Sequence, residues 1–103
     1  DILAGLDMPD AIVMRHATPH FAHVFSGDGY SAGYYSYMWS GVLDADAFEA
    51  FTEAGDPFDP DTARKLHEHI YSSGGSLDPE DAYVAFRGKL PTADALLEKE
   101  GLA

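Results

Sequence analysis

The chain contains no cysteine, which excludes disulfide bridges, a thiol nucleophile and thiolate metal ligands. Basic residues are also few, because six Lys and Arg stand against eighteen Asp and Glu, for a formal net charge of −12. Contacts with phosphates and anionic lipids need Lys and Arg, so this balance argues against nucleic acid and membrane surfaces as partners. The sequence also shows no apolar stretch of membrane-spanning length and no signal-peptide pattern.

What is present suits one small domain, since 46% of the 103 residues are hydrophobic. The excess of acidic residues has two interpretations. It would attract cationic peptides, or it would simply keep the acidic helix faces solvated.

Helix start and stop signals recur along the chain. Asp7 is a candidate N-cap for a short helix that ends near Pro19, with Ile12 and Val13 turned inward. A long helix is expected from Ser31 to Ala54, with Gly55 as its stop. One face of this helix would carry Tyr34, Met38, Gly41, Ala45 and Phe48.

Further helices are predicted where Asp-Pro pairs place an acceptor at the N-cap and a proline at the first helical position. Asp59-Pro60 opens one before Gly74-Gly75, Asp78-Pro79 opens another that ends at Gly88, and Thr92 caps a last helix before Gly101. Because β-alternation nowhere persists, we expect an all-α chain of four to five helices with one glycine-rich loop.

The stretch HFAHVFSGDGYSAGYYSYMWS, from His20 to Ser40, combines histidines, glycines and aromatic rings. A turn at 26–29 precedes Tyr30, Tyr34 and Tyr37, whose helical spacing predicts one shared face. Three phenols on one face can donate three hydrogen bonds to one ligand. The alternative is an aromatic stripe packed as core, which is the role expected of Tyr35 and Trp39.

His23 is the strongest histidine candidate, because apolar neighbours flank it and its imidazole is expected to face the glycine loop. A core histidine bonded to a backbone carbonyl is the alternative. His16, His20 and His23 would line one face of an unbroken helix and hold zinc, but Pro19 disfavours that helix. His67 and His69, two residues apart, are expected at the surface.

The His20–Ser40 segment, followed by WSGVLDADAFEAF, HEHIYSSGGS and FRGKLPTADALLEKEGL, resembles a known family. It is similar to the C-terminal part of the catalytic domain of thimet-oligopeptidase-like zinc metallopeptidases, closest to bacterial peptidyl-dipeptidase. The resemblance covers nearly the whole chain. It implies a subdomain of a larger helical enzyme that hydrolyses short peptides.

In that family a His-Glu-x-x-His helix and a distant glutamate hold the zinc, and this sequence has no such string. Residues 1–103 are therefore expected to be a C-terminal fragment of the catalytic domain, and the start at Asp1 agrees with an excised piece. The zinc ligands would lie outside the chain. By itself the chain is expected to bind no zinc and to catalyse nothing.

The resemblance also assigns roles to residues. It implies that His23, Tyr34 and Tyr37 are catalytic and donate hydrogen bonds as negative charge develops on the scissile carbonyl oxygen. It implies that four residues bind substrate, namely Tyr30, Gly27, Gly29 and Gly33. The glycines would permit positive φ and a close approach of backbone to a peptide.

The expected partners are a short peptide substrate and the remainder of the chain's own catalytic domain, and the chain is expected to self-associate when separated from it. The expected location is the bacterial cytoplasm, with the periplasm as the alternative. Arg15 and Arg87 are expected to be ordinary ion-pair residues. A second hypothesis of another class is a free-standing helical module that binds a partner through its aromatic face.

Overall fold

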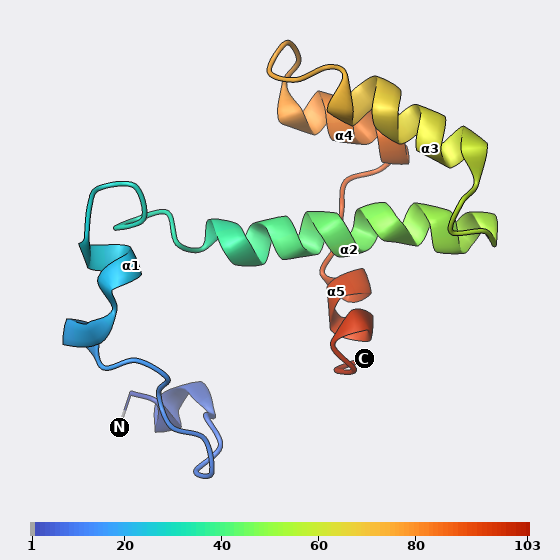
Figure 1. The fold of residues 1–103 in the computed structure, drawn as a ribbon. Helices are drawn as coiled ribbons and strands as arrows, with labels where there is room; N and C mark the ends of the chain where they lie inside the picture. Colours follow the sequence, from blue (N-terminus) through green and yellow to red (C-terminus); the bar gives the residue numbers. More distant parts are fainter. Residues whose placement is uncertain (1) are drawn as a thin grey trace. The chain divides into compact units, whose positions relative to one another are not determined.

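The computed structural model describes residues 2–103, which form helices and turns without a strand (Figure 1). The all-α prediction is confirmed. The chain divides after Tyr35 into two compact units, and Ser36–Ala103 make up the second. No helix in the described range is long and apolar enough to cross a membrane.

The first unit contains short helical turns. Two 3₁₀ turns, η1 (Ala4–Leu6) and η2 (Thr18–His20), precede the single-turn helix α1 (Ala22–Phe25). The helix predicted after Asp7 is absent, so that prediction was wrong. Asp7 adopts φ 55° and closes η1, because its N–H donates to the Ala4 carbonyl, instead of opening a new helix.

The long helix α2 runs over Ser36–Ala54 and ends at Gly55, whose φ of 78° suits a glycine C-terminal stop. The predicted end is therefore correct, but the predicted start at Ser31 was wrong by five residues. Residues 31–35 form turns, in which the Ser31 hydroxyl donates to the Asp28 carbonyl. Such local side-chain bonds compete with helix formation, so the tyrosines near this point do not share a helix face.

Both Asp-Pro signals are confirmed. Helix α3 (Pro60–Leu66) begins where the Asp59 carboxylate accepts from the Thr62 N–H at 2.7 Å, and it continues into the π-helical turn η3 (His67–Tyr71). Helix α4 (Pro79–Arg87) begins where Asp78 accepts from the Glu80 N–H at 2.9 Å. Gly88 closes it with a φ of 76°.

The last helix, α5 (Asp94–Lys99), begins two residues after the predicted cap Thr92. The Thr92 hydroxyl oxygen accepts from the Asp94 N–H at 3.4 Å, and the hydroxyl donates to the Asp94 carboxylate at 2.8 Å. Gly101 follows with a φ of 72°. Thr92 therefore lies one position before the N-cap, which is Ala93.

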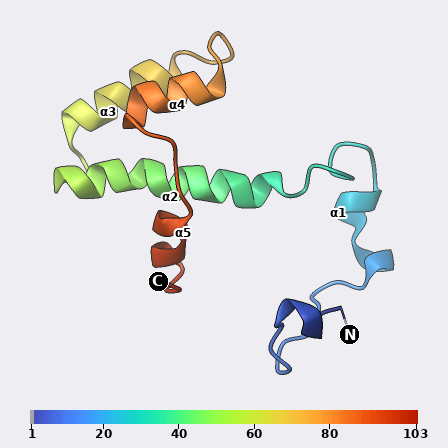
Figure 2. The ribbon, with the colours of Figure 1, turned by 180° about the vertical axis from the view of Figure 1, so that it is seen from behind.

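Within the second unit, α3 and α4 lie together on one side of α2 and α5 lies on the other (Figures 1 and 2). The buried apolar residues come from α2 and α4, and they are Ala45, Ala82, Tyr83 and Phe86. The rings of Tyr83 and Phe86 meet edge to face at 6.3 Å. This small core is the centre of the unit.

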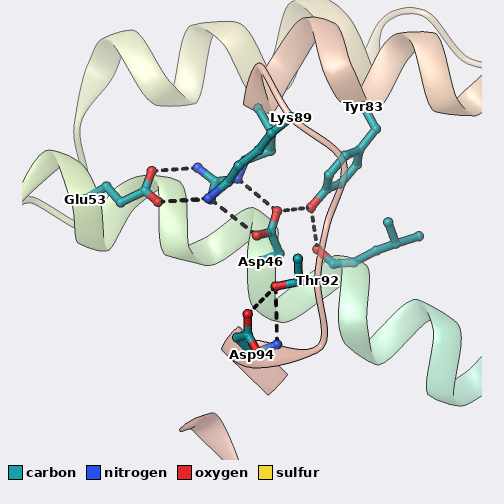
Figure 3. Close-up of polar contacts among 8 residues, drawn as sticks. Asp46, Glu53, Tyr83, Lys89, Thr92 and Asp94 are labelled. Atoms are coloured by element: carbon teal, nitrogen blue, oxygen red, sulfur yellow. Dashed lines mark hydrogen bonds and ion pairs between the residues drawn. The ribbon is translucent and has the colours of Figure 1, made fainter. Parts of the chain in front are cut away.

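A polar network joins α4 to α2 beside this core (Figure 3). The Tyr83 hydroxyl donates to Asp46 Oδ2 at 2.6 Å, and Arg87 Nε donates to the same oxygen at 2.9 Å. Arg87 also donates two hydrogen bonds to Glu53, at 2.7 and 3.1 Å. The prediction that Arg87 is an ion-pair residue is confirmed.

Two aromatic residues expected in the core lie at the surface instead. Tyr35 is 72% exposed and Trp39 is 59% exposed, so this prediction was wrong. The predicted apolar face of α2 is also only partly covered, because Ala45 is buried while Met38 and Phe48 are exposed. The network meets α2 at Leu43, Asp46 and Glu53, and the rings of Trp39 and Phe48 on either side of Leu43 remain more than half exposed.

Candidate functional site

His23, Tyr30 and Tyr34 form a cluster of rings in the first unit. The His23 ring meets Tyr30 edge to face at 4.5 Å and Tyr34 at 5.3 Å, with interplanar angles of 77° and 84°. The two phenol rings lie 6.4 Å apart. The structure therefore brings together three of the residues that the sequence singles out.

Local hydrogen bonds place His23 and the tyrosines. His23 lies in the single turn α1, which ends where the Ser26 N–H donates to the Ala22 carbonyl at 2.7 Å. The chain then reverses through the glycine loop, and the Gly33 N–H donates to the Tyr30 carbonyl at 3.4 Å. This reversal, rather than helical spacing, is what returns the Tyr30 and Tyr34 rings to the imidazole.

A hollow of about 320 Å³ lies beside the imidazole. It is lined by residues of α1 and of the glycine loop, namely Ala22, His23, Ser26, Gly27, Gly29 and Tyr30. A Cβ added at Gly27 or Gly29 would meet no atom within 4 Å, so these positions leave open space along the hollow. His23 and two of the loop glycines thus line the same hollow.

The expected reason for the glycines was wrong in one respect. Positive φ occurs at Gly55, Gly74, Gly88 and Gly101, and not in the loop. Gly33 instead lies where space is tight, because an added Cβ would lie 3.3 Å from the Gly29 carbonyl oxygen. The loop glycines therefore act through the absence of a side chain. Gly33 leaves room within the turn, and Gly27 and Gly29 leave room at its surface.

Tyr37 belongs to the first turn of α2, in the second unit, and its side chain is half exposed. It does not continue a helical face begun by Tyr30 and Tyr34, because the helix starts only at Ser36. Its participation in the site stays a prediction.

Phe21 is a member of the ring cluster that sequence reasoning missed. Its ring meets Tyr34 edge to face at 4.9 Å, and the His16 ring stacks on it at 4.8 Å with an interplanar angle of 15°. In the sequence Phe21 reads only as an apolar neighbour of His23. Its contact with Tyr34 depends on the chain reversal, which residue spacing does not reveal.

The histidines do not form a helical metal face. Pro19 lies within η2, and Phe21 separates η2 from α1, so His16, His20 and His23 are not on one continuous helix. Across residues 2–103, no three His, Asp or Glu side chains are grouped so that they could hold a metal ion. The residues that the structure describes therefore do not form a zinc site by themselves.

The chemistry available in the cluster is hydrogen-bond donation. The His23 imidazole and the Tyr30 phenol line an open hollow, the Tyr34 ring meets His23, and both tyrosines are partly exposed. Phenol O–H and imidazole N–H groups can donate to a carbonyl oxygen, and most strongly when that oxygen carries negative charge. The arrangement suits recognition of a peptide carbonyl more than nucleophilic attack.

Residues 4–102 match peptidase family M3. The chain belongs to this family. The match confirms the resemblance to thimet-oligopeptidase-like enzymes that the sequence motifs indicate.

The similar proteins include two peptidases of Escherichia coli K12. Oligopeptidase A is 49% identical over 85 residues, which are 82% of this chain and 12% of that protein. Dipeptidyl carboxypeptidase is 38% identical over 101 residues, which are 98% of this chain and 14% of that protein. Saccharolysin of Saccharomyces cerevisiae is 35% identical over 80% of this chain and 11% of its own length. The chain thus spans about one eighth of these family members.

Proposed function

We propose that residues 1–103 are the C-terminal part of the catalytic domain of a zinc metallopeptidase that hydrolyses short peptides. Membership of peptidase family M3 supports the reaction class. The small share of each relative that the chain covers supports a part of a larger catalytic domain.

The ring cluster gives this part its role in the reaction. His23 and Tyr34 donate hydrogen bonds to the carbonyl oxygen as it becomes negative, and Tyr37 is the third proposed donor. Such donors accelerate hydrolysis because they stabilise the charged transition state more than the neutral substrate. The observation that carries this assignment is the meeting of His23 and Tyr34 at 5.3 Å beside an open hollow.

Tyr30 and the loop glycines bind the peptide. Tyr30 lines the hollow with Gly27 and Gly29, and the space beside these glycines admits a substrate backbone. Gly33 leaves room beside the Gly29 carbonyl oxygen within the same loop. The net charge of −12 would also draw cationic peptides toward the enzyme.

In the complete enzyme, zinc would be held by residues outside this chain and would act as the Lewis acid for hydrolysis. The remainder of the catalytic domain is therefore an obligatory partner. The isolated chain should be inactive, and the cytoplasm is the proposed compartment of the complete enzyme.

Peptidyl-dipeptidase activity is the proposed specificity. The similarity to dipeptidyl carboxypeptidase extends over 98% of the chain, although oligopeptidase A is more identical over a shorter stretch. Product analysis on a peptide with a free C-terminus and on its amidated twin separates the two activities. Release of dipeptides from the free peptide alone supports the proposal, and equal internal cleavage of both contradicts it.

A helical interaction module is the second candidate, favoured by the exposure of Tyr35 and Trp39. The open reading frame around this segment discriminates the two. A His-Glu-x-x-His string upstream of Asp1 supports the peptidase, because that string carries zinc ligands and the general base.

The test of the proposed function is Tyr34→Phe in the full-length enzyme. The substitution removes one donor and keeps the ring that packs on His23 and Phe21. We expect kcat to fall about 10²–10³-fold, while KM, zinc content and thermal stability change little. Steady-state kinetics on a fluorogenic peptide measures this.

Tyr35→Phe is the matched control, since Tyr35 is the neighbouring phenol and lies largely exposed. It should leave kcat unchanged. Equal losses from both substitutions, or no loss from either, would defeat the assignment of Tyr34.

A further inference from the structure

The Tyr34 ring contacts three other rings, those of Phe21, His23 and Tyr30. Phe21 meets it edge to face at 4.9 Å with an interplanar angle of 79°, and His23 meets it at 5.3 Å. Edge-to-face pairs are stabilising beyond the apolar area they bury, and they depend on ring orientation. The Phe21 contact therefore restricts where the Tyr34 ring, and the hydroxyl at its tip, can lie.

Phe21 is well placed to act as a support, because its backbone is bonded on both sides. Its N–H donates to the Thr18 carbonyl at 3.2 Å, and its carbonyl accepts from the N–H groups of Val24 and Phe25 at 3.1 and 3.3 Å. Its side chain is half-buried, and His16 stacks on its ring. The ring is thus fixed at the junction of η2 and α1.

Tyr34 lies in the turns that precede α2, outside any helix. A turn constrains its backbone less tightly than a helix interior does, so ring contacts carry more of the positioning. A donor to a transition state loses effect steeply with displacement, and an error of about 1 Å can cost about 10²-fold in rate.

We propose that Phe21 is a positioning residue for Tyr34, an inference that rests on the proposed function of Tyr34 as a donor to the developing oxyanion. Phe21 is not among the residues that line the hollow beside His23. Phe21 directs the Tyr34 hydroxyl by packing against the phenol ring. The His16 ring, which stacks on the Phe21 ring, supports Phe21 in turn.

The test uses Phe21→Leu in the full-length enzyme. Leucine keeps an apolar side chain but removes the ring edge, so we expect kcat to fall about 10-fold with KM nearly unchanged. Phe21→Tyr keeps the ring and should retain most of kcat. Phe25→Leu is the matched control, because Phe25 is the phenylalanine at the other end of α1 and is 64% exposed, and it should leave kcat unchanged.

A double-mutant cycle separates positioning from a general effect on folding. In a Tyr34→Phe background the hydroxyl is gone, so adding Phe21→Leu should lower kcat no further. A double variant whose kcat loss equals the product of the two single-variant losses would overturn the proposal. If Phe21→Leu lacks zinc or unfolds, His16→Ala replaces it, with an expected two- to threefold loss of kcat that again vanishes in the Tyr34→Phe background.

The outcomes also distinguish this proposal from the one on which it rests. A large kcat loss in Tyr34→Phe with none in either Phe21→Leu or His16→Ala overturns the role of Phe21 and leaves the oxyanion donor intact. Unchanged kcat in Tyr34→Phe overturns both.

Discussion

Asp46 is a buried carboxylate whose charge is balanced by donors from α4. Burial by itself raises the pKa of Asp46, but the hydrogen bonds from Arg87 and Tyr83 outweigh it and the pKa lies below its ordinary value. Burial and the bond to Asp46 raise the pKa of the Tyr83 hydroxyl, which therefore remains a donor. The hydrogen bond from Arg87 likewise lowers the pKa of Glu53.

Arg87→Met should destabilise the chain strongly. Both partners of the Arg87–Asp46 pair have side chains that are less than one tenth exposed, so removal of the cation leaves a buried charge. Loss of one partner of a buried pair costs about 3–5 kcal/mol in free energy of unfolding. Urea unfolding of the 103-residue chain, followed by circular dichroism, measures the loss.

Arg64→Met provides the comparison at the surface. Arg64 pairs with Asp61 and Glu68, and all three side chains are at least 60% exposed. Exposed pairs contribute about 0–1 kcal/mol, so this variant should unfold almost like the parent chain. Similar losses from both substitutions would refute a special role for the Arg87 network.

At the scale of the helix, capping residues and glycines set the helix ends, and their backbone conformations agree with what the sequence predicts. Asp59 and Asp78 accept hydrogen bonds at the N-termini of α3 and α4. Gly55 and Gly88 adopt positive φ at the C-termini of α2 and α4. These ends depend on a few neighbouring residues, which is why the sequence predicts them well.

Gly88→Ala should cost about 1 kcal/mol of stability. An added Cβ would meet no atom within 4 Å, but φ at this position is 76°, a conformation that alanine disfavours. Gly75→Ala is the control, since Gly75 also has open space and lacks positive φ. Thermal unfolding compares the two, and equal midpoints would show that α4 does not need its glycine stop.

For the whole molecule, stability should fall on acidification through the network. The ordinary pKa values of 3.8 for Asp46 and 4.5 for Glu53 are lowered by folding, so their contribution is complete above these values. It is lost as the pH falls through the lower folded values. Urea midpoints between pH 6 and pH 3 should therefore decline.

The Asp46→Asn variant separates the effect of protonating Asp46 from the effect of protonating the other carboxylates. Protonation of other carboxylates relieves repulsion in a chain of net charge −12, which acts in the opposite direction. The decline should be shallower in the variant, because asparagine does not titrate. Parallel pH profiles for both chains would show that Asp46 does not contribute to acid unfolding.

Self-association of the isolated chain is the second prediction at this scale. Trp39 and Phe48 are more than half exposed on α2, and burying such rings contributes about 25 cal/mol per Å² of apolar area before association costs. Sedimentation should show mass rising with concentration, and more so at high salt, which screens the negative charge.

A Trp39→Ser, Phe48→Ser double variant should weaken this association. Phe58→Ser is the comparison, because Phe58 is also exposed but lies outside α2. A strictly monomeric parent chain at all concentrations would mean that these rings are not an association surface.

The sequence by itself determined the helical class, the family and most helix ends. It also pointed to the segment that carries His23, Tyr30 and Tyr34. These features depend on residues close together in the chain, such as an aspartate before a proline or a glycine after a helix. Local hydrogen bonds and backbone preferences are sufficient to produce them.

Only the tertiary structure decided the features that depend on residues far apart in the sequence or on a loop that reverses the direction of the chain. Asp46 and Arg87 are 41 positions apart, and only the packing of α4 on α2 joins them. The Phe21–Tyr34 contact and the late start of α2 both follow from the reversal in the glycine loop. Periodicity records which residues share a face once a helix exists, but it does not report where competing turns prevent that helix from starting.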